Sequence, residues 1–571
     1  MSYNCLDRHL ESKGDKVALI YEDNDPKIPA KNYTYKELHA EVCRFSNVLK
    51  EKGIKKGDRV CFYMSMVPEL LVGVLACTRI GAIHSVVFGG FSAKALAGRI
   101  QDSDCKILIT NDGGYRGDKI IPLKNIADEA LETCPSIESM LVMKRTLSET
   151  KWNQERDFDL RTLMDAASPI CECEQMDSED PLFILYTSGS TGQPKGLLHT
   201  TAGYMVYAKH SFENVFQVEE NDIYWCTADI GWITGHTYIT YGPLLSGATT
   251  VMFEGVPTWP DAGRFWEICD KLKVTHFYTA PTAIRALEAC DLSHVTKHSL
   301  STLKVLGSVG EPINEEAWDW YNRNIGKEKC PIVDTWWQTE TGGILISPLA
   351  GITKLKPAHA TLPLPGVLPV LVDPEGKEVE GNPAEGNLCM KTPWPSIARS
   401  IWGDHERYKQ TYFTTYPGYY FTGDGAKRDE EGFFRITGRV DDVINVSGHR
   451  MGTAEVEEAI NEHPGVVESA VVGCPHNIKG QGIYAYVICS DKELQKENLH
   501  KELNDLIVNM IGPIAKLDDL QITPGLPKTR SGKIMRRILR KIAADDTNNL
   551  GDTSTLLNPE IVELLIEGKK K

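Results

Sequence analysis

Apolar and polar positions along the first part of the chain follow two periodicities in turn. Within 38–49 apolar residues recur every three or four positions, which predicts a helix that ends near Gly53. The helix begins at Thr34, because Thr34 and Glu37 have the spacing of a capping box. The helical and strand-like runs that follow are 59–64, 69–80 and 84–88. Alternating helices and strands predict an α/β fold with a parallel sheet.

The alternation continues for about 300 residues and then changes. Short apolar runs at 183–186, 249–253, 275–278 and 303–306 are separated by helix-length segments. Beyond about residue 440 shorter elements follow: predicted helices at 454–460 and 502–510, and predicted strands at 466–472 and 484–488. This pattern predicts a separate α+β unit, so we expect an N-terminal domain at 1–440 and a C-terminal domain at 441–571.

Composition and charge narrow the class of protein. Of 571 residues 42% are hydrophobic and 25% charged, which is typical of globular chains and excludes collagen, coiled coil and wholesale disorder. The net charge of −16 disfavours nucleic acid and anionic membranes as partners. The most apolar stretch, 70–88, contains Arg79 and His84, and 1–16 lacks the apolar core of a signal peptide. Fifteen scattered cysteines fit reduced thiols, so we expect a cytoplasmic protein.

A turn rich in glycine and hydroxyl side chains follows the apolar strand at 182–185. The segment 186–196 is YTSGSTGQPKG, and it contains Lys195. Backbone N–H groups, hydroxyls and a lysine after a buried strand are suited to binding phosphate. The turn lacks the Gly-Lys-Ser/Thr ending of a Walker loop. A surface loop is the alternative interpretation, but three glycines, the hydroxyls and the lysine together favour phosphate.

The segment 186–196 resembles the phosphate-loop signature of the acyl-adenylate-forming superfamily. Motifs similar to those of that superfamily follow in the same order at 333–343, 420–424, 438–439, 445–450 and 528–533. Segments 232–238, 253–257, 278–285 and 306–314 are similar to the acetyl-CoA synthetase family within it. The resemblance covers nearly the whole chain. It implies an α/β fold with a large multi-lobed N-terminal domain of mixed and parallel sheets and a smaller, mobile α+β C-terminal domain.

The resemblance also implies an activity, that of an AMP-forming acetate–CoA ligase. A carboxylate is a poor electrophile, because its leaving group would be oxide. Coupling acetate to AMP supplies a good leaving group, which the thiol of CoA then displaces. ATP and CoA are thus implied as co-substrates, Mg²⁺ as cofactor, and rotation of the C-terminal domain between the two half-reactions.

The resemblance assigns roles residue by residue. Lys533, Thr339 and Glu340 are the implied catalytic residues: Lys533 would bridge acetate and the α-phosphate, and Glu340 would hold Mg²⁺. The implied ATP and AMP contacts are Thr187, Ser188, Gly189, Ser190, Thr191, Lys195, Gly310, Glu311, Pro312, Asp334, Thr335, Trp336, Trp337, Gln338, Thr339, Asp424, Arg439 and Arg450. His463 and Val466 match a further metal-contacting position, and Asp441 matches the hinge.

The acyl pocket and the CoA site complete the assignment. The implied acyl pocket is Ile233, Thr234, Val309 and Trp337, and the implied CoA contacts are Arg116, Lys119, Thr234, Ala280, Ser447 and Gly448. The indole of Trp337 would close the pocket, which favours acetate and leaves propionate as the alternative, since one methylene is worth only about 1–3 kcal/mol. Lys119 and Val508 stand where the family usually has arginine, which predicts a weaker grip on the CoA 3′-phosphate.

Other functions fit the residues less well. An adenylation domain that loads a carrier protein would need a carrier, and an acyl-nucleotide sensor would not need Lys533. The basic run from Lys528 to Lys541 could bind nucleic acid, but it has no interleaved aromatic residues. We therefore expect small-molecule partners (acetate, ATP and CoA), no nucleic acid and no membrane. In relatives a lysine acetyltransferase and a deacetylase act on the lysine that Lys533 matches, so the same regulation is a hypothesis here.

Overall fold

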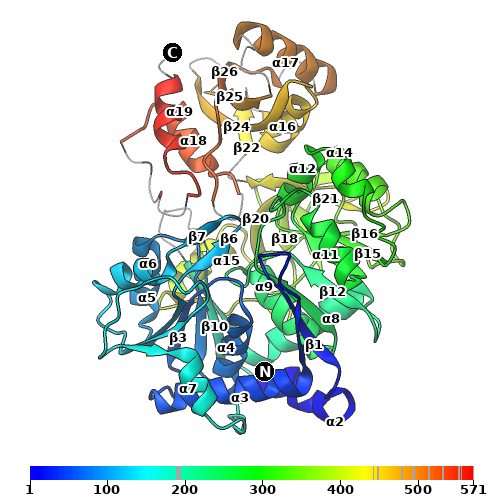
Figure 1. The fold of residues 1–571 in the computed structure, drawn as a ribbon. Helices are drawn as coiled ribbons and strands as arrows, with labels where there is room; N and C mark the ends of the chain where they lie inside the picture. The colour runs from blue at the N-terminus through cyan, green and yellow to red at the C-terminus, as the bar shows by residue number, and fades with distance from the viewer. Residues whose placement is uncertain are drawn as a thin grey trace. The chain divides into compact units, whose positions relative to one another are not determined.

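The structure is a computed structural model, and it divides the chain into two compact units. Unit 1 comprises 1–368 and 392–414, and unit 2 comprises 369–391 and 415–571. The described residues are 1–187, 195–440, 443–446, 449–476, 480–490, 496–511, 515–529, 533–548, 550, 553 and 556–569. The predicted boundary between 440 and 441 adjoins residues outside this set, and it stays a prediction. Figure 1 follows the chain through both units.

Unit 1 contains two large sheets in which most neighbouring strands are parallel. The first has the order β16 (Ile332–Asp334), β15 (Val305–Ser308), β14 (His276–Thr279), β12 (Ile223–Cys226), β13 (Thr249–Phe253), β1 (Val17–Glu22) and β2 (Lys31–Thr34). The second has the order β19 (Ser400–Ile401), β11 (Lys195–Thr200), β10 (Pro181–Thr187), β4 (Ile83–Val86), β3 (Arg59–Tyr63), β5 (Ile107–Asn111), β8 (Ser139–Met143) and β9 (Asp157–Asp159). The predicted α/β class with parallel sheets is confirmed.

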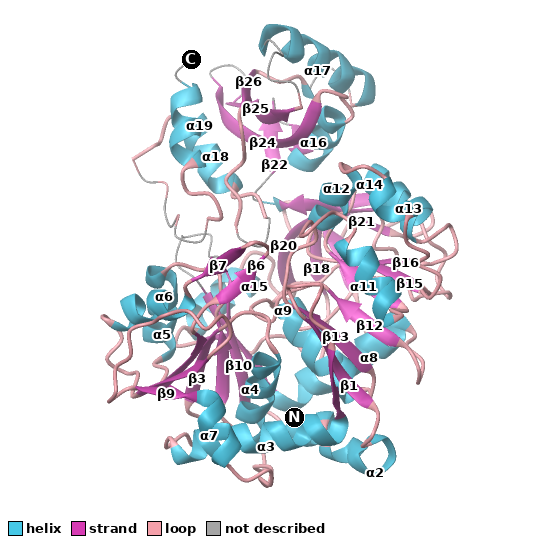
Figure 2. Ribbon diagram, in the orientation of Figure 1, coloured by secondary structure: helices cyan, strands magenta, loops and turns pink. Residues whose placement is uncertain are grey.

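Helices connect and flank these strands (Figure 2). They include α3 (Tyr35–Glu51), α4 (Pro68–Arg79), α5 (Ala93–Ser103), α6 (Leu123–Leu131), α8 (Thr201–Phe216), α11 (Arg264–Leu272), α12 (Pro281–Glu288) and α15 (His405–Phe413). The predicted start of α3 is confirmed, because Thr34 and Glu37 form a capping box there. None of the described helices has both the length and the apolar character that crossing a membrane requires.

An aromatic core anchors the first sheet of unit 1. Trp225 of β12 is fully buried, and its ring centroid lies 5.1 Å from that of Phe265 on α11 and 5.2 Å from that of Phe277 on β14. Aromatic pairs at such distances add to the free energy of burial and resist repacking. Packing among these three rings therefore holds helix α11 against the neighbouring strands β12 and β14.

Unit 2 contains two further sheets. One is antiparallel with the order β17 (Pro369–Val372), β18 (Ala384–Met390), β20 (Tyr420–Arg428) and β21 (Phe434–Arg439). The other has the order β23 (His449–Gly452), β22 (Val443–Val446), β25 (Gly480–Cys489) and β24 (Val466–His476), with β26 (Asp519–Ile522) also on β25. Its helices are α16 (Thr453–Asn461), α17 (Lys496–Met510), α18 (Arg536–Ala543) and α19 (Ile561–Lys569).

The second sheet of unit 2 is buried on both faces. Val471 belongs to an apolar cluster with residues of α16 and α17, and its neighbour Val472 belongs to a cluster with residues of α18 and α19. Neighbouring residues of a strand point to opposite faces, so each face is covered by its own pair of helices. The helices and strands predicted within 454–510 are confirmed.

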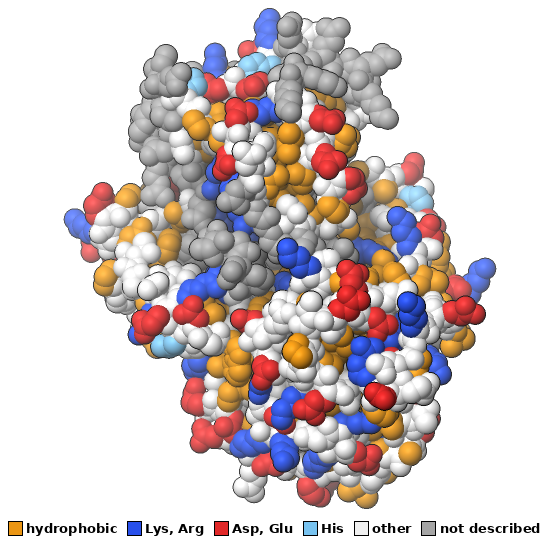
Figure 3. Space-filling model, turned by 90° about the vertical axis from the view of Figure 1, so that its left-hand side faces the viewer, with side chains coloured by type: hydrophobic (Ala, Val, Ile, Leu, Met, Phe, Trp, Pro, Cys, Tyr) orange, Lys and Arg blue, Asp and Glu red, His pale blue; other side chains and the backbone are white. Residues whose placement is uncertain are grey.

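Acidic and basic side chains mix on one face of the molecule, and the cysteines are free. On the face drawn in Figure 3 acidic and basic side chains are interspersed, so the net charge of −16 is not gathered there into one patch. All fifteen cysteines are free thiols.

Candidate active site

The carboxyl ends of four adjacent parallel strands of unit 1, β12, β14, β15 and β16, form one edge of the first sheet. Gly310 to Pro312 follow β15, and Asp334 ends β16 directly beside Ser308 of β15. Ligands of open α/β sheets bind outside such carboxyl ends. The structure therefore brings together the two segments predicted to frame adenine.

Glu311 and Asp334 have contrasting surroundings at this edge. Glu311 accepts hydrogen bonds from the Thr282 hydroxyl and, at 2.7 Å, from the Arg285 guanidinium, both on α12. Burial raises the pKa of Asp334 to about 7. A carboxyl group that is partly protonated near neutral pH can donate a hydrogen bond as well as accept one. Gly310 has a φ of 98°, a left-handed conformation that favours glycine.

Trp337 is held on two sides by tyrosines. Its indole N–H donates to the Tyr278 hydroxyl at 3.3 Å, and that hydroxyl lies 2.7 Å from the Thr335 hydroxyl. The ring of Tyr238 stands at 89° to the indole, with centroids 5.0 Å apart. The indole is thus fixed by a hydrogen bond and an edge-to-face contact, and its role as a wall of the acyl pocket stays a prediction.

The other predicted pocket residues are on neighbouring segments. Ile233 and Thr234 lie in the short helix α9 (Ile233–Gly235), which leads directly into the helical segment His236–Tyr241 that carries Tyr238. Val309 follows β15, and Ile233 and Val309 are both buried.

Lys195 and Glu340 are brought together by a third residue. The Lys195 ammonium donates to the Tyr412 hydroxyl at 2.9 Å, and that hydroxyl donates to Glu340 Oε1. Lys195 Nζ lies 3.9 Å from the same carboxylate oxygen. A lysine and a carboxylate in this arrangement can bind phosphate and a hard divalent cation side by side.

Thr187 lies at the other end of the phosphate loop. It is paired directly opposite Lys195 on β10 and β11, and among the described residues its buried Oγ1 has no hydrogen-bond partner. Ser188, Gly189, Ser190 and Thr191 lie outside the described residues.

A buried histidine supports the backbone beside Glu340. His199 of β11 is fully buried, which lowers its pKa to about 4, so its ring is neutral at physiological pH. Its Nε2 lies 2.8 Å from the Thr339 carbonyl oxygen, and a neutral ring reaches that oxygen by donating its N–H. Gln338 N donates to the Thr341 hydroxyl at 2.9 Å. The segment of Thr339 and Glu340 is therefore held from both sides.

The predicted CoA contacts in unit 1 lie on separate segments. Arg116 and Lys119 face each other across a hairpin of β6 (Gly114–Arg116) and β7 (Lys119–Ile121). Burial raises the pKa of Asp229 to about 6, an effect that the charge of Arg116 opposes. Ala280 precedes α12 at its N-terminus.

Asp424 and Arg439 of unit 2 are direct partners on β20 and β21. Arg439 Nη1 donates to the Thr422 carbonyl at 3.1 Å and approaches Asp424 Oδ1 at 3.4 Å. Asp424 is buried. A carboxyl group has two oxygens that can accept hydrogen bonds, so Asp424 can bind ligand hydroxyls as well as Arg439.

The other predicted site residues of unit 2 lie on separate segments or outside the described residues. His463 Nδ1 accepts from Gly465 N at 3.1 Å, and its Nε2 lies 2.9 Å from Glu502, so its role toward a metal stays a prediction, as does that of Val466 at the start of β24. Lys533 is exposed, and its backbone N–H donates to the Thr529 hydroxyl at 3.1 Å. Arg450 lies on β23, and its side chain is outside the described set, as are Asp441, Ser447 and Gly448.

No cluster of three or more His, Cys, Asp or Glu suited to a metal occurs among the described residues. Glu340 nevertheless fits Mg²⁺, which often takes one or two protein carboxylates together with substrate phosphates.

Sequence reasoning missed Tyr278, His199 and Tyr412 as site residues. Tyr278 lies within the segment 278–285 that resembles the family, but nothing in the sequence indicated that its hydroxyl would contact Trp337. His199 and Tyr412 act across the fold, on Thr339 and Glu340. Only a predicted contact map could have found them.

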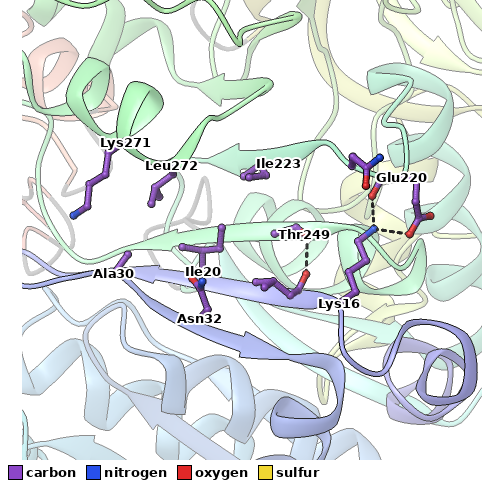
Figure 4. Close-up of a pocket in the computed structure, with 11 residues that line it drawn as sticks. Lys16, Ile20, Ala30, Asn32, Glu220, Ile223, Thr249, Lys271 and Leu272 are labelled. Atoms are coloured by element: carbon purple, nitrogen blue, oxygen red, sulfur yellow. Dashed lines mark hydrogen bonds and ion pairs between the residues drawn. The ribbon is translucent and has the colours of Figure 1, made fainter.

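An open groove of about 710 Å³ lies elsewhere on the first sheet (Figure 4). Its lysines are already paired: Lys16 with Glu220 at 3.0 Å and Lys271 with Glu22 at 2.7 Å. None of the described site residues lines it, so it does not enlarge the candidate site.

Comparisons with known proteins identify the family of the chain. Residues 6–402 match the sequence model of the AMP-binding enzyme family, and 455–533 that of the AMP-binding enzyme C-terminal domain. The chain is 60% identical over 570 residues to an acetyl-coenzyme A synthetase of Syntrophobacter fumaroxidans, covering 100% of this chain and 87% of that protein. It is 59% identical over 569 residues to an acetyl-coenzyme A synthetase of Alkalilimnicola ehrlichii, covering 100% and 88%.

A solved structure has the same fold. An acetoacetyl-CoA synthetase from Streptomyces lividans superposes with a TM-score of 0.90 at 23% identity, covering 100% of this chain and 86% of that one.

Proposed function

The chain belongs to the AMP-binding enzyme family, and we propose that it is an acetate–CoA ligase. It converts ATP, acetate and CoA to acetyl-CoA, AMP and diphosphate through an enzyme-bound acetyl-adenylate. Relatives that are about 60% identical over the whole chain are named acetyl-coenzyme A synthetase, which disfavours the propionate alternative.

The structural observation that best supports the proposal is that Lys195 and Glu340, which are distant in the chain, both form hydrogen bonds with the Tyr412 hydroxyl. In the first half-reaction an acetate oxygen attacks the α-phosphorus of ATP, and diphosphate leaves. Both reactants are anions, so the protein must offset their repulsion by positioning and by positive charge. Lys195 supplies such a charge at the predicted phosphate loop.

The second half-reaction needs a different set of residues. The sulfur of CoA attacks the acyl carbon, the thiol proton is released, and AMP leaves. Arg116 and Lys119 would hold the phosphate end of CoA. Trp337 would limit the acyl group in both half-reactions, because its indole is fixed by Tyr278.

Several finer assignments belong to this proposal. Glu340 would hold Mg²⁺, which supplies charge neutralisation to the phosphates. Asp424 would accept hydrogen bonds from both ribose hydroxyls, since a carboxylate has two acceptor oxygens. Lys533 would bridge acetate and the α-phosphate during adenylation. Rotation of the C-terminal domain between half-reactions remains a prediction.

The proposal extends to regulation and location. Acetylation of Lys533 would remove the charge that adenylation needs, with an acetyltransferase and a deacetylase as protein partners. We propose a cytoplasmic location, where acetate, ATP and CoA are available as small-molecule substrates.

Acetate-dependent exchange of pyrophosphate into ATP tests the proposal. We expect exchange without CoA, and acetyl-CoA formation when CoA is added, with acetate preferred among C1 to C5 acids. Lys533→Ala should lower exchange by about 100-fold or more, because a charge that stabilises the transition state is lost. Lys541→Ala is the matched control, since Lys541 lies in the same basic run and pairs with Asp546 at 3.8 Å. Absence of exchange with every short acid would contradict the proposed activity.

A further inference from the structure

The β6–β7 hairpin of unit 1 places two cationic side chains side by side. Arg116 and Lys119 are direct partners across the hairpin. Opposite residues on antiparallel strands have Cβ atoms about 4.5–5.5 Å apart, and like charges there destabilise the pair. Neither side chain forms an ion pair within the part of the chain that the structure describes. A doubly charged anion bound between them would relieve this repulsion.

The turn of this hairpin is fastened by one side chain. Asn24 Nδ2 donates to the Gly117 carbonyl at 2.9 Å, and Gly117 N donates to Asn24 Oδ1 at 3.1 Å. The carboxamide thus pairs with the peptide groups of Gly117 as a neighbouring strand would. Asn24 is only 3% exposed, so water does not compete for these bonds. Gly117 is the residue directly after Arg116, and its φ of 65° favours glycine.

A buried network of charged residues connects the segment of Asn24 to the hairpin. Asp23, the residue before Asn24, pairs with Arg145 at 2.8 Å, and Arg145 pairs with Glu254 at 2.7 Å. Glu254 also accepts from Tyr21 of β1 at 2.8 Å. The guanidinium of Arg145 lies 4.6 Å from the ring centroid of Tyr115 on β6. The hairpin therefore rests on groups from three distant segments of the chain.

We propose that Asn24 is a positioning residue for the CoA-dependent half-reaction, because it fixes the turn that aims Arg116 and Lys119 at the 3′-phosphate of CoA. This inference rests on the proposed function. Asn24 itself touches neither acetate nor ATP in it, and so it acts on CoA affinity and not on adenylation. The side-chain amide is required, because both of its groups are used.

The test compares two half-reactions in the full chain. Asn24→Asp replaces the donating Nδ2 by an oxygen that repels the Gly117 carbonyl, and Asn24→Ala removes both bonds. We expect each variant to raise the KM for CoA by about five- to tenfold, the effect of one or two lost hydrogen bonds. Pyrophosphate exchange without CoA should stay within about twofold of the parent, since its residues lie elsewhere. The KM for dephospho-CoA, which lacks the 3′-phosphate, should not rise.

A matched asparagine serves as control. Asn47 on α3 donates from Nδ2 to the Ser168 and Ile170 carbonyls, both at 2.9 Å, so Asn47→Asp and Asn47→Ala lose similar bonds far from the hairpin. They should leave the KM for CoA unchanged.

Three results would overturn the inference: an unchanged KM for CoA, an equal rise for dephospho-CoA, or a parallel loss of exchange in both Asn24 variants. A parent enzyme without acetate-dependent exchange would instead overturn the proposed function, and this inference with it.

Discussion

Replacing Trp337 by glycine tests how the fold limits the acyl group. The indole is fixed by its hydrogen bond to Tyr278 at 3.3 Å and by the perpendicular ring of Tyr238 at 5.0 Å. It cannot move aside easily, because Tyr278 is itself held by Thr335 at 2.7 Å. Removing the indole therefore opens space without rearranging its neighbours, and longer acids should enter.

The size of the effect follows from the methylenes that become buried. Valerate has three more methylenes than acetate, and each buried methylene is worth about 0.8 kcal/mol. The sum is about 2.4 kcal/mol, so the ratio of kcat/KM for valerate to that for acetate should rise by about 60-fold at most. Acetate should bind less well than in the parent, because the enlarged pocket leaves it partly in contact with water.

The assay is kcat/KM for acyl-CoA formation across C2 to C5 acids in the parent and Trp337→Gly. Trp152→Gly is a suitable control, since Trp152 is a half-buried tryptophan of unit 1 that packs against a different core. An unchanged order of preference in a folded Trp337→Gly enzyme would refute the assignment of the indole as the wall of the pocket.

Two further predictions concern Tyr412 and His39. Tyr412→Phe removes the hydrogen bond to Glu340 and should lower kcat/KM for adenylation by about tenfold or more, as for other bonds to charged groups. Tyr408 lies on the same helix as Tyr412, and its hydroxyl donates to the Ala398 backbone carbonyl, so Tyr408→Phe should have a smaller effect in the exchange assay. The hydrogen bond to Asp7 raises the pKa of His39 from 6.5 to about 9, so its stabilisation is complete below about pH 6.5 and is lost as pH rises toward 9. The difference in Tm between parent and His39→Gln should therefore be larger at about pH 6 than at about pH 9.5, and the opposite trend would contradict the reasoning.

Local patterns predicted much of the fold. The capping box at Thr34 gave the start of α3, because it depends on residues three positions apart. The apolar runs gave β3, β10, β13 and β14 to within a few residues, since burial of a central strand leaves a continuous apolar segment. The family resemblance also implied that the segments of Gly310 and Asp334 both contact adenine, and both lie at the carboxyl ends of the neighbouring parallel strands β15 and β16.

The order of apolar runs and motifs along the chain was enough to predict the fold class and the family, because helix and strand periodicities and sequence motifs are each readable within short segments. The assignment of nucleotide-binding residues stays a prediction. The hydrogen bond from Tyr412 to Glu340, that between His199 and Thr339, and the pairing of Asn24 with Gly117 were decided only by the tertiary structure. Each joins side chains and backbone that are far apart in sequence. Such contacts depend on how sheets and helices pack, and a local sequence pattern does not determine that packing.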